Sequence, residues 1–391
     1  MTASPATLPT GAPAAGPVPF NRATVAPRQL PYLEQSSRSG QLAGDGPFGA
    51  AASKELSGLH AGAPVLLTPS CTAALELSAL LLDLQPGDEV IVPSFTFSST
   101  AGAFALMGAR IVFADIDPVT LGIDTAQVAQ LITPRTRAIV PVHYGGVPTP
   151  PALRALADRH GALLIEDNAH GLYGSLHGQP LGTFGHLSTL SFHNTKNITC
   201  GEGGALVVND TALHERAEIL REKGTDRARF FRGMVDKYSW VDVGSSYLLS
   251  DLNAAMLLAQ LEFGAEIQAR RQAAWDHYRA VVGPAAEARG ATVFEPGPGV
   301  VNAYHLFVLL LPSLEARAAL LAAAQEQGIG CTFHYVPLHS SAAGRRAGTA
   351  PLGCPVTDSV SDRLIRLPLF SDIGPADYER VADVMARLLA S

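Results

Sequence analysis

The sequence predicts an α/β protein with one open sheet and helical crossovers, followed by a smaller α+β domain. From about residue 63, short apolar runs alternate with apolar-periodic runs of helical spacing, which is typical of sheet strands joined by helices. Polar and aromatic residues recur where the apolar runs end. After about Glu262 a long, charged helical pattern begins and the alternation changes.

Bulk composition excludes several classes of protein. The chain has 391 residues, of which 47% are hydrophobic and 16% charged, so it can bury a large core in two domains. A formal net charge of -7 argues against a nucleic-acid partner. No apolar run reaches the roughly 18 residues of a membrane span. The four cysteines form no CxxC pair and have no metal-ligand spacing, so we expect reduced thiols, a cytoplasmic protein and no metal.

Three segments are expected along the chain. Residues 1–19 are rich in proline and lack both a basic stretch and an apolar core, so they predict a disordered extension rather than a signal peptide. Residues 20–262 carry the α/β alternation and predict the large domain. Residues 263–391 predict the small domain.

The expected elements follow from apolar runs, helical periodicity and turn residues. Strands are expected in seven places of the large domain: 65–70, 85–95, 109–117, 137–144, 162–170, 186–193 and 204–209. Helices are expected between them: 72–84, 98–108, 125–133 and 151–161. In the small domain we expect, in order, a helix over 262–283, a strand over 305–312, a helix over 315–328, a strand-like segment ending at 339 and a helix over 376–390.

Lys196 lies on a loop between two expected strands and precedes the glycine cluster at 201–204. A lysine that forms a Schiff base must sit on a short, well-held loop where its amine can lose a proton. Nearby glycines let the backbone approach a flat ligand. The alternative is a solvated lysine on an ordinary glycine-rich turn.

Asp167 ends an expected buried strand, where an unpaired carboxylate is costly. The protonated ring nitrogen of pyridoxal phosphate is a suitable partner, and the alternative is a cap of the next loop. The neighbouring Glu166 should point to the opposite face of the sheet, and we expect it to be structural.

Other residues at the strand ends suit the same cofactor. Thr72 opens a helix, and helix N-termini bind phosphate, although Thr72 could simply cap that helix. Ser191 could add a hydroxyl to the same phosphate. Phe97 follows a strand and could stack on a flat ring, or belong to the core. In open α/β sheets, ligands bind beyond the carboxyl ends of the strands, so these residues are expected to meet.

With those residues laid out, the chain resembles the DegT/DnrJ/EryC1/StrS family of sugar aminotransferases, which have the fold-type I architecture of aspartate aminotransferase. The resemblance runs from about Pro31 to the C-terminus and is nearest to the branch that makes dTDP-4-amino-4,6-dideoxygalactose from dTDP-4-keto-6-deoxyglucose. The matching stretches include TPSCTAALELSALLLDLQPGDEVIVPSFTF, RAIVPVHYGG, SFHNTKN, GEGGAL, FHYVPLH and RLPLF.

The resemblance implies pyridoxal 5'-phosphate as cofactor, a mixed, mostly parallel sheet and a role for each matching residue. Lys196 matches the Schiff-base lysine and proton shuttle, and Asp167 the partner of the ring nitrogen. His170 matches the residue near the ring hydroxyl, and Phe97 the stacking aromatic. The residues that match phosphate contacts are Cys71, Thr72 and Ser191.

The resemblance also implies L-glutamate as donor, a dTDP-linked keto sugar as acceptor, and a homodimer with its active site at the interface. Candidate contacts to the sugar nucleotide or to the second subunit are Arg232, Lys237, Tyr238 and His334. Where many relatives have Asn and Arg, this chain has Ser246 and Leu248. The usual cross-subunit phosphate contact is therefore in question, although the nearest branch shares this form.

Several alternatives stay open at this point. The product could be a 3-amino sugar or the gluco epimer of the 4-amino sugar. Dehydratases of this fold carry histidine at the lysine position, so Lys196 argues against one. A non-catalytic regulatory relative would be expected to have lost the lysine, the aspartate or the phosphate site. A serine or cysteine hydrolase is disfavoured because no GxSxG motif is present.

Overall fold

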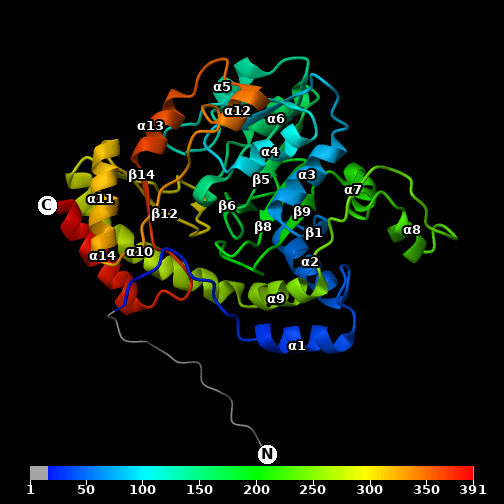
Figure 1. Cartoon of the computed structure of the whole chain (residues 1–391), viewed down its shortest axis with the longest axis horizontal. Helices are drawn as coiled ribbons and strands as arrows, with labels where there is room; N and C mark the ends of the chain where they lie inside the picture. The colour runs from blue at the N-terminus through cyan, green and yellow to red at the C-terminus, as the bar shows by residue number, and fades with distance from the viewer. Residues whose placement is uncertain (1–15, 391) are drawn as a thin grey trace, which may run out of the picture.

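The computed structural model describes residues 16–390, and a sheet of eight strands lies at its centre (Figure 1). The strand order is β1-β9-β8-β5-β4-β2-β3-β13. The run from β8 to β13 is parallel, whereas β9 is antiparallel to both neighbours, so the predicted mixed, mostly parallel sheet is confirmed. The strand bounds are β1 Val65–Thr68, β2 Glu89–Pro93, β3 Arg110–Ala114, β4 Thr136–Ile139, β5 Leu163–Asp167, β8 Leu187–Ser191, β9 Gly204–Val208 and β13 Gly348–Thr349.

Helices cover both faces of this sheet because its strands are apolar on both sides. Within β1, for example, Leu66 packs into the core under one set of helices and Leu67 into the core under another. The first face carries α3 Cys71–Leu81, α4 Ser98–Leu106 and α7 His214–Arg221. The second face carries α2 Pro47–Leu59, α5 Thr125–Leu131, α6 Ala152–Arg159 and α9 Asp251–Glu262.

A smaller antiparallel sheet follows, with its own core. Its order is β10-β12-β14, and its strands are β10 Thr292–Val293, β12 Phe307–Leu310 and β14 Leu364–Leu367. The helices that pack on it are α10 Gly264–Ala288, α11 Leu314–Glu326 and α14 Pro375–Ala390. The predicted boundary at residue 262 falls between α9 and α10. The division into two domains stays a prediction, and β13 returns to the edge of the central sheet beside β3.

The remaining elements lie outside the two sheets already described. The helices are α1 Gln29–Ser39, α8 Arg227–Phe231, α12 Ala342–Ala347, α13 Pro355–Arg363 and the 3-10 turns Tyr144–Gly146 and Thr211–Leu213. A third small sheet contains β6 Ser175–Leu176, β7 Gln179–Pro180 and β11 Val300–Val301. None of the helices in residues 16–390 is both long and apolar enough to cross a membrane.

Two expectations about local structure need correction. The strand-like segment ending at 339 is irregular, and only Thr332 in it pairs with a strand, at Arg366. The proposed extension 1–19 lies outside the described residues up to residue 15, but its end is folded. Val18 is 2% exposed and forms a parallel bridge with Ile329, because its apolar side chain joins the core of the small sheet.

Candidate active site

A cavity of about 650 Å³ lies beyond the carboxyl ends of the parallel strands. Its walls come from the loops after β1, β2, β5 and β8 and from the segment around β14. Eight residues selected from the sequence line it: Cys71, Thr72, Phe97, Asp167, His170, Ser191, Lys196 and His334. Residues far apart in the chain therefore meet where the strand-end argument expects them.

Lys196 is half-buried on the loop between β8 and β9. Its backbone N–H donates to the carbonyl of His193 at 2.9 Å, and the next side chain, Asn197, donates to the carbonyl of Ala303 at 2.6 Å. These bonds fix the loop on both sides of the lysine. Burial lowers the pKa of Lys196 to about 8, and the charge of Arg366 acts in the same direction.

Gly203 of the glycine cluster lines the cavity, whereas Gly204 has a packing role. A Cβ at Gly204 would lie 2.3 to 2.5 Å from backbone atoms of Ser70 and Cys71, which real side chains do not tolerate. Gly204 therefore lets β9 approach the start of α3. This contact brings the lysine loop and the N-terminus of α3 to the same cavity.

Asp167 is 5% exposed at the end of β5. One carboxylate oxygen accepts a hydrogen bond from the Thr100 hydroxyl at 2.7 Å, and the other accepts one from the Ala169 N–H at 3.2 Å. Burial raises the pKa of Asp167 although both hydrogen bonds oppose that shift. Within residues 16–390 this carboxylate has no ion-pair partner, so it can accept a cation from a ligand in the cavity.

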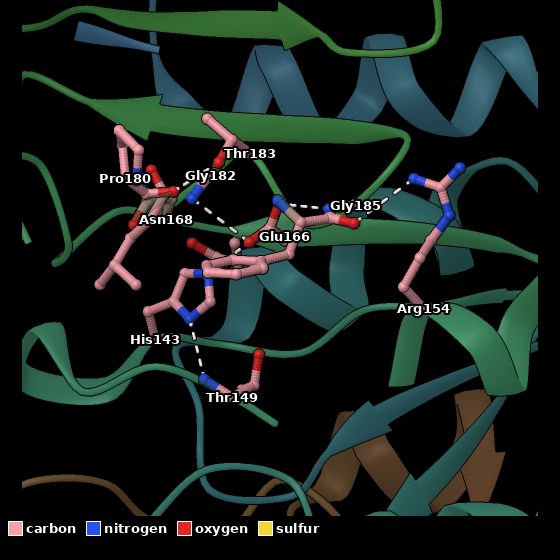
Figure 2. Close-up of polar contacts among 12 residues, drawn as sticks. His143, Thr149, Arg154, Glu166, Asn168, Pro180, Gly182, Thr183 and Gly185 are labelled. Atoms are coloured by element: carbon pink, nitrogen blue, oxygen red, sulfur yellow. Dashed lines mark hydrogen bonds and ion pairs between the residues drawn. The ribbon is translucent and has the colours of Figure 1, made fainter. Parts of the chain in front are cut away.

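Glu166 points to the other side of the sheet and organises the backbone there (Figure 2). Its carboxylate accepts hydrogen bonds from the N–H groups of Gly182, Phe184 and Gly185. The Nδ1 atom of His143 accepts from the Thr149 N–H, so Nε2 carries the proton and donates it to Glu166 at 2.7 Å. The bonds from Gly182, Phe184 and Gly185 hold the turn before β8, the bond from Thr149 holds the loop after β4, and Glu166 does not line the cavity.

The first turn of α3 lines the cavity with Cys71 and Thr72. Ser70 is the cap residue, and its hydroxyl accepts from the Ala73 N–H at 3.0 Å. Thr72 therefore does not cap the helix, and its hydroxyl lies 2.8 Å from that of Ser99 on the cavity wall. Together with Ser191, these groups form a set of donors suited to a phosphate.

Cys71 and Phe97 complete this side of the cavity. Burial raises the pKa of the Cys71 thiol to about 12, so the thiol stays protonated and is a poor nucleophile. Phe97 is 61% exposed although it is a large apolar residue. Its position on the cavity wall leaves a ring available for stacking on a flat ligand.

Three further histidines line the cavity: His170, His305 and His334. The ring of His170 lies 4.3 Å from that of His305 and is parallel to that of His334. Burial holds the pKa of His170 and His305 well below the usual range and lowers that of His334 to about 2, so all three are neutral. Among the described residues, no group of three or more His, Cys, Asp or Glu side chains is arranged to bind a metal.

Three predicted contact residues lie away from this cavity. Arg232, Lys237 and Tyr238 belong to the segment 227–243, which we call the arm, and α8 within it stands away from the body of the molecule (Figure 1). Arg232 forms an ion pair with Glu218. Within one chain, the arm does not contribute to the site, and a contact with ligand stays a prediction.

Sequence reasoning missed other residues of the cavity wall. Thr100 lies in an expected helix, and its role depends on a hydrogen bond to Asp167 that only the fold creates. Arg366 lies in the RLPLF stretch, where nothing in the sequence marks it as a cavity residue. Phe20 lines the cavity from a segment without a recognisable signal, and His305 lines it from the start of the expected strand 305–312, whose apolar pattern does not mark a site residue.

The donor set of this cavity fits pyridoxal phosphate. A buried carboxylate without an ion-pair partner can hold the ring nitrogen, the first turn of α3 can hold the phosphate, and a lysine with a lowered pKa lines the same cavity. An α/β fold with these groups at its strand ends defines the class of pyridoxal-phosphate enzymes.

The chain belongs to the DegT/DnrJ/EryC1/StrS aminotransferase family, which residues 24–386 match. It is similar in structure to the aminotransferase TlmJ from Streptoalloteichus hindustanus, with 28% identity over 95% of this chain and 99% of that one and a TM-score of 0.87. The sugar aminotransferase CalS13 from Micromonospora echinospora matches with 27% identity, 95% and 99% coverage and a TM-score of 0.84. The enzyme is an aminotransferase, and its cofactor is pyridoxal phosphate.

Not every similar protein is named for a sugar substrate. The 3-amino-5-hydroxybenzoic acid (AHBA) synthase matches with 27% identity, over 94% of this chain and 98% of that one, and a TM-score of 0.84. The acceptor of the present enzyme therefore has to be argued separately from its fold.

Proposed function

We propose that the enzyme transfers the amino group of L-glutamate to C4 of dTDP-4-keto-6-deoxyglucose, giving dTDP-4-amino-4,6-dideoxygalactose and 2-oxoglutarate. The main support for transamination is that Lys196, Asp167 and the N-terminus of α3 all line one cavity. The choice of acceptor rests on the sequence stretches shared with that branch of the family, including the form with Ser246 and Leu248.

The bound cofactor supplies an electron sink that stabilises negative charge on the carbon from which a proton is removed. In this proposal Lys196 holds the cofactor and then moves that proton as general acid and base. Its lowered pKa supports the assignment, because an amine that titrates near pH 8 can give and take a proton at neutral pH. Cys71, Thr72 and Ser191 would hold the phosphate.

Asp167 would keep the ring nitrogen protonated, and Phe97 would cover one face of the ring. His170 is neutral and lies in the same cavity, so it can hydrogen-bond the ring hydroxyl without adding charge. His334 lines the cavity from the segment before β14, which supports its assignment to the substrate side of the site.

We further propose a homodimer in which the arm contributes to the partner's active site. The arm exposes apolar side chains to an extent unusual for a free surface. Its most exposed members are Trp240 at 79%, Phe231 at 70% and Met234 at 56%. Ser246 is also exposed beside the arm, as a residue that contacts a second subunit would be. Arg232, Lys237 and Tyr238 would meet the sugar nucleotide across the interface.

Product analysis tests the proposed reaction. Holoenzyme is incubated with L-glutamate and either dTDP-4-keto-6-deoxyglucose or the corresponding 3-keto nucleotide sugar, and the product is examined by NMR. The proposal expects an amine at C4 with galacto configuration. A 3-amino product, or the gluco epimer, would assign the enzyme to another branch, and no product from either sugar would refute the nucleotide-sugar proposal.

A further inference from the structure

Arg366 on β14 lines the same cavity as Lys196 and is 8% exposed. Within residues 16–390 it forms no ion pair with any carboxylate. A buried charge without a partner is costly, and most buried arginines are paired. The position of this one on a cavity wall indicates that its partner comes from a ligand.

The hydrogen bonds of Arg366 are also incomplete. One terminal nitrogen donates to the Phe333 carbonyl at 3.0 Å, whereas the Nε–H is buried and has no acceptor among the described residues. The Phe20 ring covers one face of the guanidinium at 4.6 Å. A guanidinium offers five N–H donors in one plane. The Phe20 ring therefore packs against the face of the group, and some of the donors at its edge have no acceptor.

The charges around the cavity favour an anion near Arg366. The lining cations are Lys196 and Arg366, and the lining carboxylates are Asp167 and Glu202. Asp167 is assigned to the cofactor ring in the proposed function, and the Glu202 side chain is 70% exposed to solvent. With His170, His305 and His334 neutral, Arg366 carries a positive charge to which the proposed function assigns no partner.

The two proposed substrates differ in where they carry negative charge. An amino-acid donor has a carboxylate on the carbon that loses its amino group. A 4-keto sugar has no charge at C4, and its diphosphate is attached to C1, across the sugar ring. A cation in the same cavity as the reacting lysine therefore fits the donor better than the acceptor.

We propose that Arg366 binds a carboxylate of the amino-acid donor through paired hydrogen bonds and so makes the donor half of the reaction selective for amino acids. The inference rests on the proposed transamination and names the group that recognises its donor. Planar bidentate pairing is the favoured geometry between arginine and a carboxylate.

Binding of a dicarboxylate that cannot react tests the assignment apart from catalysis. Glutarate has the two carboxylates of glutamate but no amino group, and its affinity for the holoenzyme is measured by calorimetry. Arg366→Gln is expected to weaken glutarate binding by about 100-fold, and Arg366→Lys by an intermediate factor. The matched control is Arg317→Gln, because Arg317 also stacks on a phenylalanine and has an unpartnered Nε but does not line the cavity.

Separate half-reactions distinguish the possible ligands. Arg366→Gln is expected to slow the reaction with L-glutamate by about 100-fold, while enzyme already converted with glutamate reacts with the keto sugar as wild type does. Equal glutarate binding by wild type and Arg366→Gln overturns the inference. A loss confined to the keto-sugar half also overturns it and assigns Arg366 to the diphosphate. A wild type inert to both substrates would instead refute the proposed function.

Discussion

At the scale of single residues, burial tunes the two titratable groups assigned to the cofactor. Burial lowers the pKa of Lys196 to about 8, against a usual value of about 10.4. At pH 7.5 the free amine is then roughly a quarter of the total, whereas it would be about one part in a thousand for an ordinary lysine. The site therefore supplies a nucleophilic amine at neutral pH.

This pKa predicts how cofactor uptake depends on pH. Only the uncharged amine attacks an aldehyde, so the rate at which apoenzyme takes up pyridoxal phosphate should rise with pH and reach half of its maximum near pH 8. Stopped-flow absorbance across pH 6 to 10 measures it. A rate that rises up to pH 10 without reaching a plateau would contradict the role given to burial.

The pKa of Asp167 is shifted in the opposite direction to that of Lys196. Burial raises its pKa, so the native apoenzyme holds the proton of this carboxyl more tightly than the unfolded chain does. Folding stability contributed by Asp167 is therefore complete at low pH and is lost as the pH rises from the unfolded pKa to the raised native one.

It follows that Asp167→Asn should melt at the same or a higher temperature than wild type as apoenzyme at pH 7.5, because the buried charge is gone. The same change should reduce transamination by at least about 100-fold, since a neutral amide cannot hold a protonated ring nitrogen. Calorimetry of the apoenzyme and a turnover assay check the two parts. A variant that is both active and less stable would contradict the account.

At the scale of elements, the site depends on how closely β9 approaches α3. Gly204→Ala should lower the free energy of unfolding by about 3 kcal/mol, because its Cβ would overlap the backbone of Ser70 and Cys71. Gly201→Ala is the matched control. It has a φ of 86° but open space around its Cβ, so only about 1 kcal/mol is expected. Denaturant unfolding compares the two, and equal losses would show that the close contact is unimportant.

Elements of the large domain were predictable because their signals are local. Apolar runs of strand length and helix periodicity gave β1 to β5, β8, β9 and the helices between them. The strand-end rule then brought Thr72, Asp167, Ser191 and Lys196 together. The irregular segment before residue 339 was misread as a strand, because an apolar and aromatic composition does not reveal that its partners are Ser94 and Arg366.

The cavity wall from the small sheet was not predictable in the same way. Arg366 lies on β14 of the small sheet, whereas Lys196 lies on a loop of the central sheet. The residues around Arg366 in the sequence do not indicate that its guanidinium lacks a partner. Thr100 likewise acquires a role only when α4 packs beside the end of β5. The roles of these two residues depend on contacts that are present or missing only in the folded chain. A single sequence does not reveal such contacts.

At the scale of the whole molecule, the arm predicts association of two chains. Trp240→Glu should convert a dimer into a monomer, because a charge replaces an aromatic side chain buried at the proposed interface. Val119→Glu is the control, since Val119 is 74% exposed but lies outside the arm. Light scattering gives the mass and a turnover assay the activity. A fully active monomer would contradict a site shared between subunits.

The central claim is that Lys196 holds pyridoxal phosphate and passes an amino group from glutamate. The most direct measurement is the visible absorption spectrum of the holoenzyme before and after adding L-glutamate alone, with Lys196→Ala in parallel. The account predicts a band in wild type that glutamate bleaches, and no glutamate response in Lys196→Ala. A wild-type band that glutamate leaves unchanged, or an equal response in Lys196→Ala, would contradict it.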